Sequence, residues 1–567
     1  MIETNRSQAN IGTKAIALLA VFLPIFFFCA VAWRYCDNIP WFDDFDAFPI
    51  FLHQFINADS FFDKWSEIVK PNNEHRMVFG KLATVGYYFI TKTLNFRFLQ
   101  AVGICFTLGT FVIFFKSLKR AELSLWFLVP ISLLLFQFEH YLVYGWSICG
   151  LQHQPVIFFI TLTAYLLSRQ YFYWAIVAAI CANFSMSNGN LVWVVGAGIL
   201  LLQYQYKNLG LWIAVGLLMI YFYLHGITAM GNESSIPYII QHPILTILGF
   251  FTFLGGILDI LPSYPLNFRI VLPIIGGILG ILSIIVWWIM LLRNWLKHNS
   301  KSAKIHSELQ LFVFGVSIFL IVNALIIAFL RPRFGFMVMV VSNYKLYPAL
   351  FFITIYVAFL TNYKSLKSKK TILVTSILIS LGIWIFSSVH YINEFSERSK
   401  SLVINAYNQV YNGTGLGLPP NNHYSQHIDA VMNELSQNNI YKYPTSYTPI
   451  VEAIKHNFQK KFPNQPVIYN TDKNIIITQQ SKAHFNAQDG AVYIYFKSEK
   501  NLYIFKMDPV PYQGKNIFRT YRDNVQFTID DYSNSFLSGQ YLLGFVKVEN
   551  SQIEAGQYGP INIPKFK

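Results

Sequence analysis

Long apolar segments separated by short polar loops fill the first 390 residues of this chain. A helix needs about 20 mostly apolar residues to cross a bilayer. Eleven stretches approach that length and are expected to be membrane-spanning helices: 15–33, 98–115, 123–138, 154–168, 171–186, 190–202, 209–225, 270–292, 309–330, 348–361 and 371–390. Two further apolar stretches, 77–93 and 244–262, are ambiguous. We expect them to lie in, or dip into, the outer membrane interface.

The pattern changes at about residue 391, where long apolar segments stop. Residues 391–464 are mixed, with a helical pattern from Ile428 to Leu435, and are expected to form an external linker. From 465 to 567, short alternating segments between turn residues predict a small antiparallel β domain of the sandwich type. The expected strands are Val467–Tyr469, Asn474–Thr478, Ala491–Phe496, Leu502–Lys506, Val525–Ile529 and Tyr541–Val548. The predicted fold class is therefore a mainly α, polytopic membrane domain over 1–390, followed by an extramembrane β-rich domain.

Composition agrees with a membrane protein. The chain is 54% hydrophobic and 13% charged, with a mean hydropathy of +0.40, whereas an average soluble domain has about 25% charged residues. The net charge of +15 comes from basic residues in short loops between apolar segments, where such residues set membrane orientation. This placement argues against a nucleic-acid-binding surface.

The positions of the basic loops predict the orientation of the chain in the membrane. Cytoplasmic loops of membrane proteins are enriched in Lys and Arg. If neither ambiguous stretch spans, the main basic loops fall on the same side as the amino terminus: 116–120, Arg169, Lys207, 293–304 and 364–370. Eleven spans then place the carboxyl terminus outside. The first span is expected to stay uncleaved, and an external disulfide between Cys36 and Cys149 would be allowed in an oxidising compartment.

An acidic loop follows the first span, with the sequence Trp41-Phe42-Asp43-Asp44-Phe45-Asp46. Inverting glycosyl transfer needs one carboxylate to take the acceptor's proton. A second acid can raise the pKa of the first or hold a cation, so Asp43 and Asp44 are the candidate catalytic residues. A divalent cation such as Mg²⁺ or Mn²⁺ is a candidate cofactor, although no spacing in the chain resembles a metal site. The alternative is a solvated acidic loop beside the membrane.

Two basic groups on the expected outer side suit a phosphate. Arg adds a charge-assisted fork for phosphate oxygens, and a helix beginning at this point would add its positive end. Basic residues on the outer side break the usual orientation pattern. The candidate donor-binding residues are Glu74, His75, Arg76, Arg331, Arg333 and Lys345. The alternatives are a helix cap with a snorkelling Arg76 and contact with lipid headgroups.

Further polar residues on the expected outer side could bind sugar hydroxyls beside an aromatic ring. The candidate sugar- or acceptor-binding residues are Asp46, Glu139, His140, Trp146, Gln152, His153 and Asn188. For Asn188, which lies in the sequence Ser187-Asn188-Gly189-Asn190, a simple turn is the alternative.

These features together resemble the GT-C superfamily of polytopic membrane glycosyltransferases. The architecture resembles that family over the whole chain, whereas specific sequence motifs resemble it only over about residues 34–100. There, Asp43-Asp44 matches the acidic pair of the family's first outer loop. Glu74-His75-Arg76 matches a second site of the family more loosely. The resemblance implies a sugar donor on a polyprenyl phosphate, and an envelope glycan, lipid or protein acceptor. It also implies action at the periplasmic face of a bacterial inner membrane, with Asp43 slightly favoured as the base. A narrower similarity is to O-antigen glucosyltransferases of lipopolysaccharide assembly.

The sequence departs from the GT-C pattern at two points, and two other functions are alternatives. The carboxy-terminal region has no WWD motif of the oligosaccharyltransferase type, and Phe45 follows the acidic pair where a Pro or Arg would assign a subfamily. A polysaccharide polymerase or ligase would be expected to centre its chemistry on a mid-chain outer loop. A transporter would show ionisable or broken positions at mid-membrane depth, often in two related halves.

Overall fold

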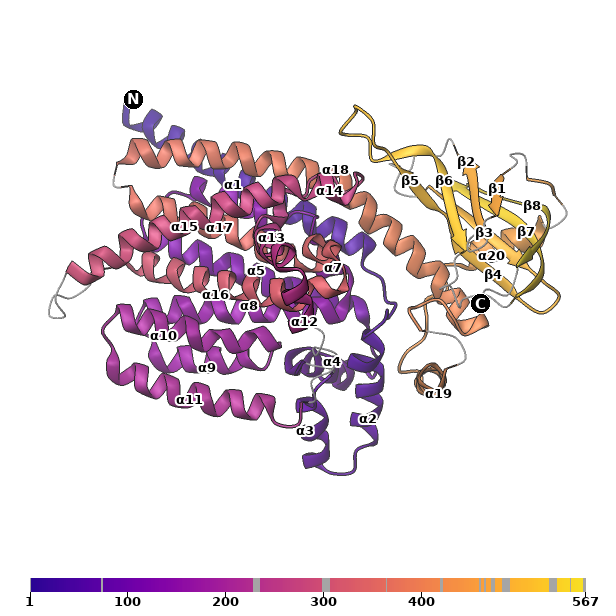
Figure 1. The fold of residues 1–567 in the computed structure, drawn as a ribbon, viewed down its shortest axis with the longest axis horizontal. Helices are drawn as coiled ribbons and strands as arrows, with labels where there is room; N and C mark the ends of the chain where they lie inside the picture. The colour runs from indigo at the N-terminus through magenta and orange to yellow at the C-terminus, as the bar shows by residue number, and fades with distance from the viewer. Residues whose placement is uncertain are drawn as a thin grey trace. The chain divides into compact units, whose positions relative to one another are not determined.

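The computed structural model describes residues 12–72, 75–227, 235–297, 306–363, 365–418, 422–457, 460–462, 466–470, 475–481, 490–529, 538–550 and 552–563, and also the backbone of residues 2–11. The chain is mainly helical, and its strands begin only at Val467 (Figure 1). It divides into two compact units. The helical unit comprises 1–34, 59–83 and 99–388, and the β-containing unit comprises 35–58, 84–98 and 389–567.

The helical unit is a bundle joined by short turns. Its α-helices are α1 (Ile2–Tyr35), α3 (Phe61–Val69), α4 (Val78–Thr91), α5 (Phe96–Arg120), α6 (Val129–Leu135), α7 (Tyr141–Gly145), α8 (Ser147–Ser168), α9 (Phe172–Asn183), α10 (Val192–Leu202), α11 (Tyr206–Leu224), α12 (Ser235–Gln241), α13 (Pro243–Leu254), α14 (Leu266–Arg269), α15 (Val271–Lys297), α16 (Glu308–Leu330), α17 (Leu346–Asn362) and α18 (Leu366–Asn412). Short 3-10 turns are η2 (Leu125–Leu128), η3 (Ser187–Leu191), η5 (Gly256–Leu258), η6 (Pro332–Phe334), η7 (Phe336–Val340) and η8 (Ser342–Tyr344). Helices α1, α4, α5 and α18 contribute residues to both units.

Within the described residues, seven helices are long and apolar enough to cross a membrane. They are Gly12–Tyr35, Phe96–Arg120, Tyr206–Leu224, Leu266–Leu296, Glu308–Leu330, Ser342–Asn362 and Leu366–Asn412. Each overlaps one of the expected spans over nearly all of that span's length. The chain thus has the character of a multi-pass membrane protein, with fewer clear spans than the eleven predicted.

The other four expected spans correspond to helices that are too short or too polar to count as clear membrane-spanning helices. Helix α9 has 12 residues and reaches only about 18 Å, well short of a hydrocarbon core of about 30 Å. The segments 123–138 and 190–202 are likewise short helices, Leu125–Leu135 and Ser187–Leu202. Helix α8 has 22 residues, but Gln152, His153 and Gln154 lower its mean hydropathy.

The two ambiguous stretches do not form straight spans. Residues 77–93 contain the 14-residue helix α4. In 244–262, α13 is bent by 105° relative to α12 across a short break. Counting this bent pair as one span would raise the count to eight among the described residues.

Glycines allow close packing inside the bundle. A Cβ on Gly196 would lie 2.1 Å from the Trp212 ring, and one on Gly216 would lie 2.9 Å from the Trp193 ring. The two indole rings pack with centroids 4.9 Å apart. Each indole therefore sits where its partner helix, α10 or α11, carries no side chain, which locks the two helices together.

The β-containing unit holds η1 (Asp46–Ile50), α2 (Phe51–Asn57), the end of α18, α19 (His423–Gln437) and α20 (Thr448–His456). Its strands are β1 (Val467–Asn470), β2 (Ile475–Gln480), β3 (Ala491–Lys497), β4 (Leu502–Lys506), β5 (Asp508–Pro511), β6 (Tyr521–Ile529), β7 (Gly539–Glu549) and β8 (Gln552–Ile563). In the described ranges they form two four-stranded antiparallel sheets, in the orders β1-β2-β6-β5 and β4-β3-β7-β8.

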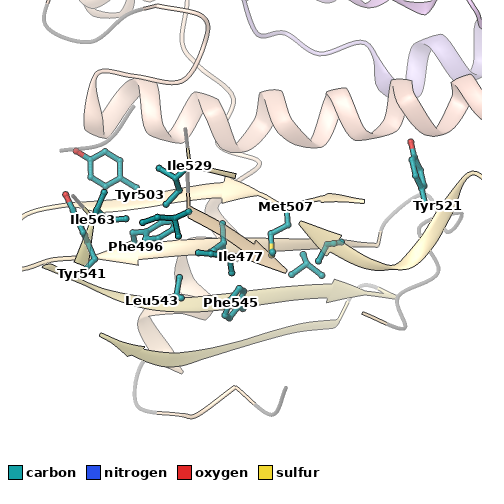
Figure 2. Close-up of a cluster of buried hydrophobic side chains, with 14 residues drawn as sticks. Ile477, Phe496, Tyr503, Met507, Tyr521, Ile529, Tyr541, Leu543, Phe545 and Ile563 are labelled. Atoms are coloured by element: carbon teal, nitrogen blue, oxygen red, sulfur yellow. The ribbon is translucent and has the colours of Figure 1, made fainter. Parts of the chain in front are cut away.

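One apolar cluster is shared by the two sheets (Figure 2). Ile477 of β2 and Val525 of β6 join Phe496 of β3 and Phe545 of β7 in it. Alternate residues of β3, such as Tyr493, belong instead to a second cluster with residues of α18 and α20. Strand β3 is therefore buried on both faces, which explains its almost continuous run of apolar residues.

The disulfide that the sequence would allow is not formed. All five cysteines lie in the described ranges and are free, including Cys36 and Cys149.

Candidate functional site

The acidic loop, residues 41–46, belongs to the β-containing unit. Phe42 has a φ of 51°, which is uncommon for a residue other than glycine. Its backbone N donates to Leu416 O at 3.0 Å. A Cβ on Gly417 would lie 2.2 Å from the Phe42 ring, so the ring packs directly on a glycine. Unusual backbone of this kind persists where surrounding contacts over-determine it, and it clusters at functional sites.

The two adjacent aspartates have different environments. Asp44 is only 1% exposed, and its Oδ2 accepts a hydrogen bond from Trp41 N at 3.1 Å. The Asp44 backbone N donates to Trp41 O, also at 3.1 Å. Asp44 therefore closes the turn. Asp43 is half-buried, and its pKa is raised by burial and by the nearby Asp46. Of the pair, Asp43 has the properties of a general base.

Asp46 is held by a tyrosine from a distant helix. The Tyr424 hydroxyl donates to Asp46 Oδ2, and burial and Asp46 together raise the pKa of Tyr424 so that the phenol stays protonated. Asn422 caps α19 by accepting from Tyr424 N at 2.6 Å, which fixes the start of that helix. Among the described residues, none donates a hydrogen bond to the Asp43 carboxylate, so this carboxylate is free to accept a proton.

Basic residues accompany the acidic loop, and sequence reasoning missed them. The Arg398 guanidinium lies 4.4 Å from the Trp41 ring centroid, in a cation–π contact. Burial raises the pKa of Asp37 to about 6, while Arg398 and Arg97 favour its charged form. Arg398 lies on α18, in a segment that the sequence suggested was a linker. The helical pattern of 391–412 was the available signal, because it continues the last span without a break.

A charged quartet lies inside the helical unit: Glu139, Asp259, Arg269 and Lys345. Lys345 Nζ lies 2.8 Å from Asp259 Oδ2 and 3.4 Å from Glu139 Oε2. Arg269 binds Asp259 through two nitrogens, at 2.7 and 3.0 Å. Glu139 and Lys345 were predicted to contact sugar and donor, respectively. The structure shows that Lys345 contacts both Glu139 and Asp259, and the contact with Asp259 was not predicted.

The two acids of the quartet respond differently to burial. Burial raises the pKa of Glu139 to about 8, although Lys345 opposes the shift. Burial also disfavours ionised Asp259, but Lys345 and Arg269 outweigh it and lower the pKa of Asp259. Glu139 therefore titrates near neutral pH, while Asp259 stays ionised.

Three predicted sugar-binding residues lie near Glu139 along the chain. His140 is fully buried, with Nδ1 3.1 Å from Gln137 Nε2 and Nε2 3.2 Å from Leu135 O. Burial lowers the pKa of His140 to about 3, so the ring is neutral. Half-buried Trp146 precedes α8, and Gln152 Nε2 lies 3.2 Å from Met77 Sδ. His140 is thus buried and hydrogen-bonded within the protein, whereas part of the Trp146 side chain is exposed to solvent.

A second polar network connects α8, η3, α16 and α17. His153 Nδ1 lies 2.7 Å from the Tyr347 hydroxyl. Asn188 Nδ2 donates to the same hydroxyl and to Asn323 Oδ1, both at 2.9 Å. Asn188 Oδ1 and Asn323 Nδ2 are buried and make no hydrogen bond to the described residues. Because unpaired buried polar atoms are costly, this amide pair could bind a polar group.

Two further predicted residues approach this network. Burial lowers the pKa of His153 to about 3, with smaller electrostatic contributions from His75 and Arg331. Arg331 is half-buried, and its Nε atom has no hydrogen-bond partner among the described residues. His75 and Arg331 thus act electrostatically on His153, which shares the Tyr347 hydroxyl with Asn188. A common binding region for these residues stays a prediction.

The other basic candidates are engaged elsewhere. The Arg76 guanidinium donates to three backbone carbonyls, those of Tyr223, Val69 and His225. Arg333 Nη1 donates to Ser235 Oγ at 2.9 Å, and its guanidinium lies 4.5 Å from the Phe334 ring centroid. Because the Arg76 guanidinium already donates to three carbonyl groups, few of its N–H groups are left to bind a phosphate. Glu74 lies outside the described residues.

A cavity of about 560 Å³ lies in the helical unit, at a different place. Its lining includes the ion pair of Arg120 and Glu308. Glu308 begins α16, whereas Arg331 directly follows its last residue, so the cavity and the His153 network lie at opposite ends of this helix. We do not assign the candidate chemistry to this cavity.

No group of three or more His, Cys, Asp or Glu residues suited to a metal occurs in the described part of the chain. Comparisons with protein-family models, curated proteins and solved structures found no match to this chain.

Proposed function

We propose that this protein is a membrane glycosyltransferase that moves a sugar from a polyprenyl-phosphate donor to a cell-envelope acceptor, with Asp43 as the general base. The main support is the difference between the two adjacent aspartates. Asp43 is half-buried and its pKa is raised, whereas the Asp44 carboxylate accepts the hydrogen bond that closes the turn. A base works best when its pKa approaches the operating pH.

Other residues receive roles within this proposal. Arg331 is the proposed contact of the donor phosphate, because its Nε atom has no hydrogen-bond partner among the described residues. Asn188 and Asn323 present an unpaired acceptor and donor suited to hydroxyl groups. We place the amino terminus in the cytoplasm and a sandwich-like β domain in the periplasm of a bacterium, from the distribution of basic loops.

The test compares envelope glycans, by mass spectrometry, in cells with and without this protein. Loss of one sugar from one glycan on deletion, restored by the parent gene but not by Asp43→Asn, supports the proposal. Equal restoration by Asp43→Asn, with both proteins present in the membrane at equal amounts, would remove Asp43 as the base.

A carrier is the second candidate, favoured by the charged quartet and by the 105° bend between α12 and α13. Carriers often place ionisable side chains and broken helices around a central site. Substrate flux into vesicles that Lys345→Met abolishes at an equal amount of folded protein, without any glycan change, would favour the carrier.

A further inference from the structure

The turn between β5 and β6, residues 512–520, is well ordered. Tyr512 N donates to Thr520 O at 2.9 Å and closes the turn. Asn516 Oδ1 accepts from Phe518 N at 3.1 Å, and the Arg519 guanidinium lies 4.9 Å from the Tyr512 ring centroid. The tip therefore has a defined conformation, which fixes the side chains that it presents.

The turn is attached to one short stretch of α18. His390 Nε2 lies 2.9 Å from Ile517 O, and Asn393 Nδ2 donates to Thr520 Oγ1 at 3.2 Å. The Tyr521 hydroxyl donates to Glu394 Oε1 at 3.0 Å, and Figure 2 shows Tyr521 at the end of its strand beside the helix. Thr520 and His390 are buried, so the joint excludes water.

This stretch lies at the end of the apolar part of α18. No Asp, Glu, Lys or Arg occurs between Lys370 and Glu394. A helix of that length rises about 36 Å, which slightly exceeds a hydrocarbon core of about 30 Å. The turn is therefore attached where α18 leaves the bilayer.

The tip presents apolar and basic side chains together. Ile517 is 39% exposed and Phe518 is 52% exposed. Lys515 and Arg522 are exposed as well, whereas Arg519 is paired with Asp523 at 2.8 Å. Aromatic and aliphatic residues flanked by basic ones are the pattern of segments that lie in a membrane interface containing anionic lipids.

We propose that the β5–β6 turn is a membrane anchor for the β-containing unit. Ile517 and Phe518 enter the interface of the bilayer that α18 crosses, and Lys515 and Arg522 contact anionic headgroups. The attachment to His390, Asn393 and Glu394 sets the depth of the tip. This role does not depend on glycosyl transfer, since it follows from the contacts of the turn alone.

The test places an environment-sensitive fluorophore on the full-length protein at Ile517→Cys, in lipid nanodiscs with and without anionic lipid. Val467→Cys on β1 is the matched control, because Val467 is also apolar and 52% exposed. All variants carry Cys105→Ser, which removes the exposed native thiol. Ile517→Cys leaves the backbone oxygen bound by His390 in place.

We expect the label at 517 to be quenched by lipid-attached quenchers at least about twofold more than the label at 467, and shielded from aqueous iodide. Adding Lys515→Gln and Arg522→Gln should reduce the shielding mainly in anionic nanodiscs. Equal behaviour of the two labels overturns the proposal. Shielding from both quenchers in every lipid and in detergent also overturns it, because a protein surface would then cover the tip.

Discussion

Lys345 and Asp259 form an ion pair of 2.8 Å between side chains that are 1% and 0% exposed. This pairing gives a structural reason for the lysine that follows Arg331 and Arg333 in the sequence. Its charge is balanced by ionised Asp259, while Glu139 lies 3.4 Å away and favours its protonated form. Lys345 therefore stabilises the interior, and Arg331 becomes the stronger candidate for an external anion.

Replacing Lys345 by Met should strongly destabilise the helical unit. Breaking a buried pair costs about 3–5 kcal/mol when it leaves a charge without a partner. Because Arg269 still pairs with Asp259 in this variant, we expect a loss toward the lower end of that range. The matched control is Lys70→Met, because Lys70 pairs with Glu67 at 3.1 Å but is 50% exposed, where such pairs contribute at most about 1 kcal/mol. Thermal unfolding in detergent measures both. Equal shifts in the two variants would contradict a buried quartet.

Glu139 should make stability depend on pH. Its pKa rises from 4.5 to about 8 on folding because of burial, so the folded protein favours the protonated form. This contribution is complete below pH 4.5 and is lost as pH rises through about 8. We expect the Tm of the parent to fall relative to that of Glu139→Gln between pH 5 and pH 8. A constant difference across this range would argue against a titrating Glu139. Taking the difference cancels His140 and His153, whose lowered pKa values act in the opposite direction.

Much of the fold could be predicted because its strongest determinants are local. The seven clear spans and six of the strands follow from apolar length and from alternation. The missed strands β5 and β8 are edge strands that contain Pro509, Pro511 and Pro560. Proline cannot donate to a sheet ladder and is tolerated mainly at edges, so the signals used to find strands were weak there.

The site was less predictable because its partners are distant in sequence. The grouping of His153 with Asn188 and Arg331 follows from a shared expected face of the membrane. The pairing of Lys345 with Asp259 spans 86 residues, and no local pattern announces it. The contrast between Asp43 and Asp44 depends on a turn whose backbone is set by Leu416 and Gly417, which no reading of residues 41–46 alone could provide.

The two aspartates of the acidic loop should separate activity from folding. Asp43→Asn should lower the transfer rate by about 10²–10⁴-fold, the usual contribution of a general base, with unchanged Tm. Asp44→Ala should lower stability by about 1 kcal/mol through loss of the bond from Trp41 N. Rates with purified donor and acceptor, together with thermal unfolding, distinguish the two. A fully active Asp43→Asn enzyme would contradict the assignment.

The acidic limb of the pH–rate profile offers a separate check on Asp43. Because burial and Asp46 raise its pKa, activity should begin to fall at a pH above the ordinary range of aspartate. Asp46→Asn removes the neighbouring negative charge and should move this limb to lower pH. A limb that does not move in Asp46→Asn would mean that another group limits the rate at low pH.

The neighbouring arginines Arg331 and Arg333 should differ in donor binding. Arg331 Nε has no hydrogen-bond partner among the described residues, while Arg333 donates to Ser235. We expect Arg331→Gln to raise the donor KM about tenfold or more, as loss of a charge-assisted hydrogen bond would, and Arg333→Gln to raise it less. Steady-state kinetics at fixed acceptor measures both. Unchanged KM in Arg331→Gln would remove it as the phosphate contact.

The topology follows from parity, so it can be tested without knowing the substrate. The four expected spans that are short or polar follow one another along the chain, so crossing by none, by two or by all four of them leaves the side of every later loop unchanged. With an even number of those crossings, a crossing by the bent pair α12–α13 would reverse the side of every loop after it. We expect reporters that are active only outside the cytoplasm to work when fused after His225, after Leu258 and after Lys567, and to fail after Lys119. Activity after His225 with none after Leu258 and Lys567 would show that the bent pair crosses, giving eight spans and an internal carboxyl terminus.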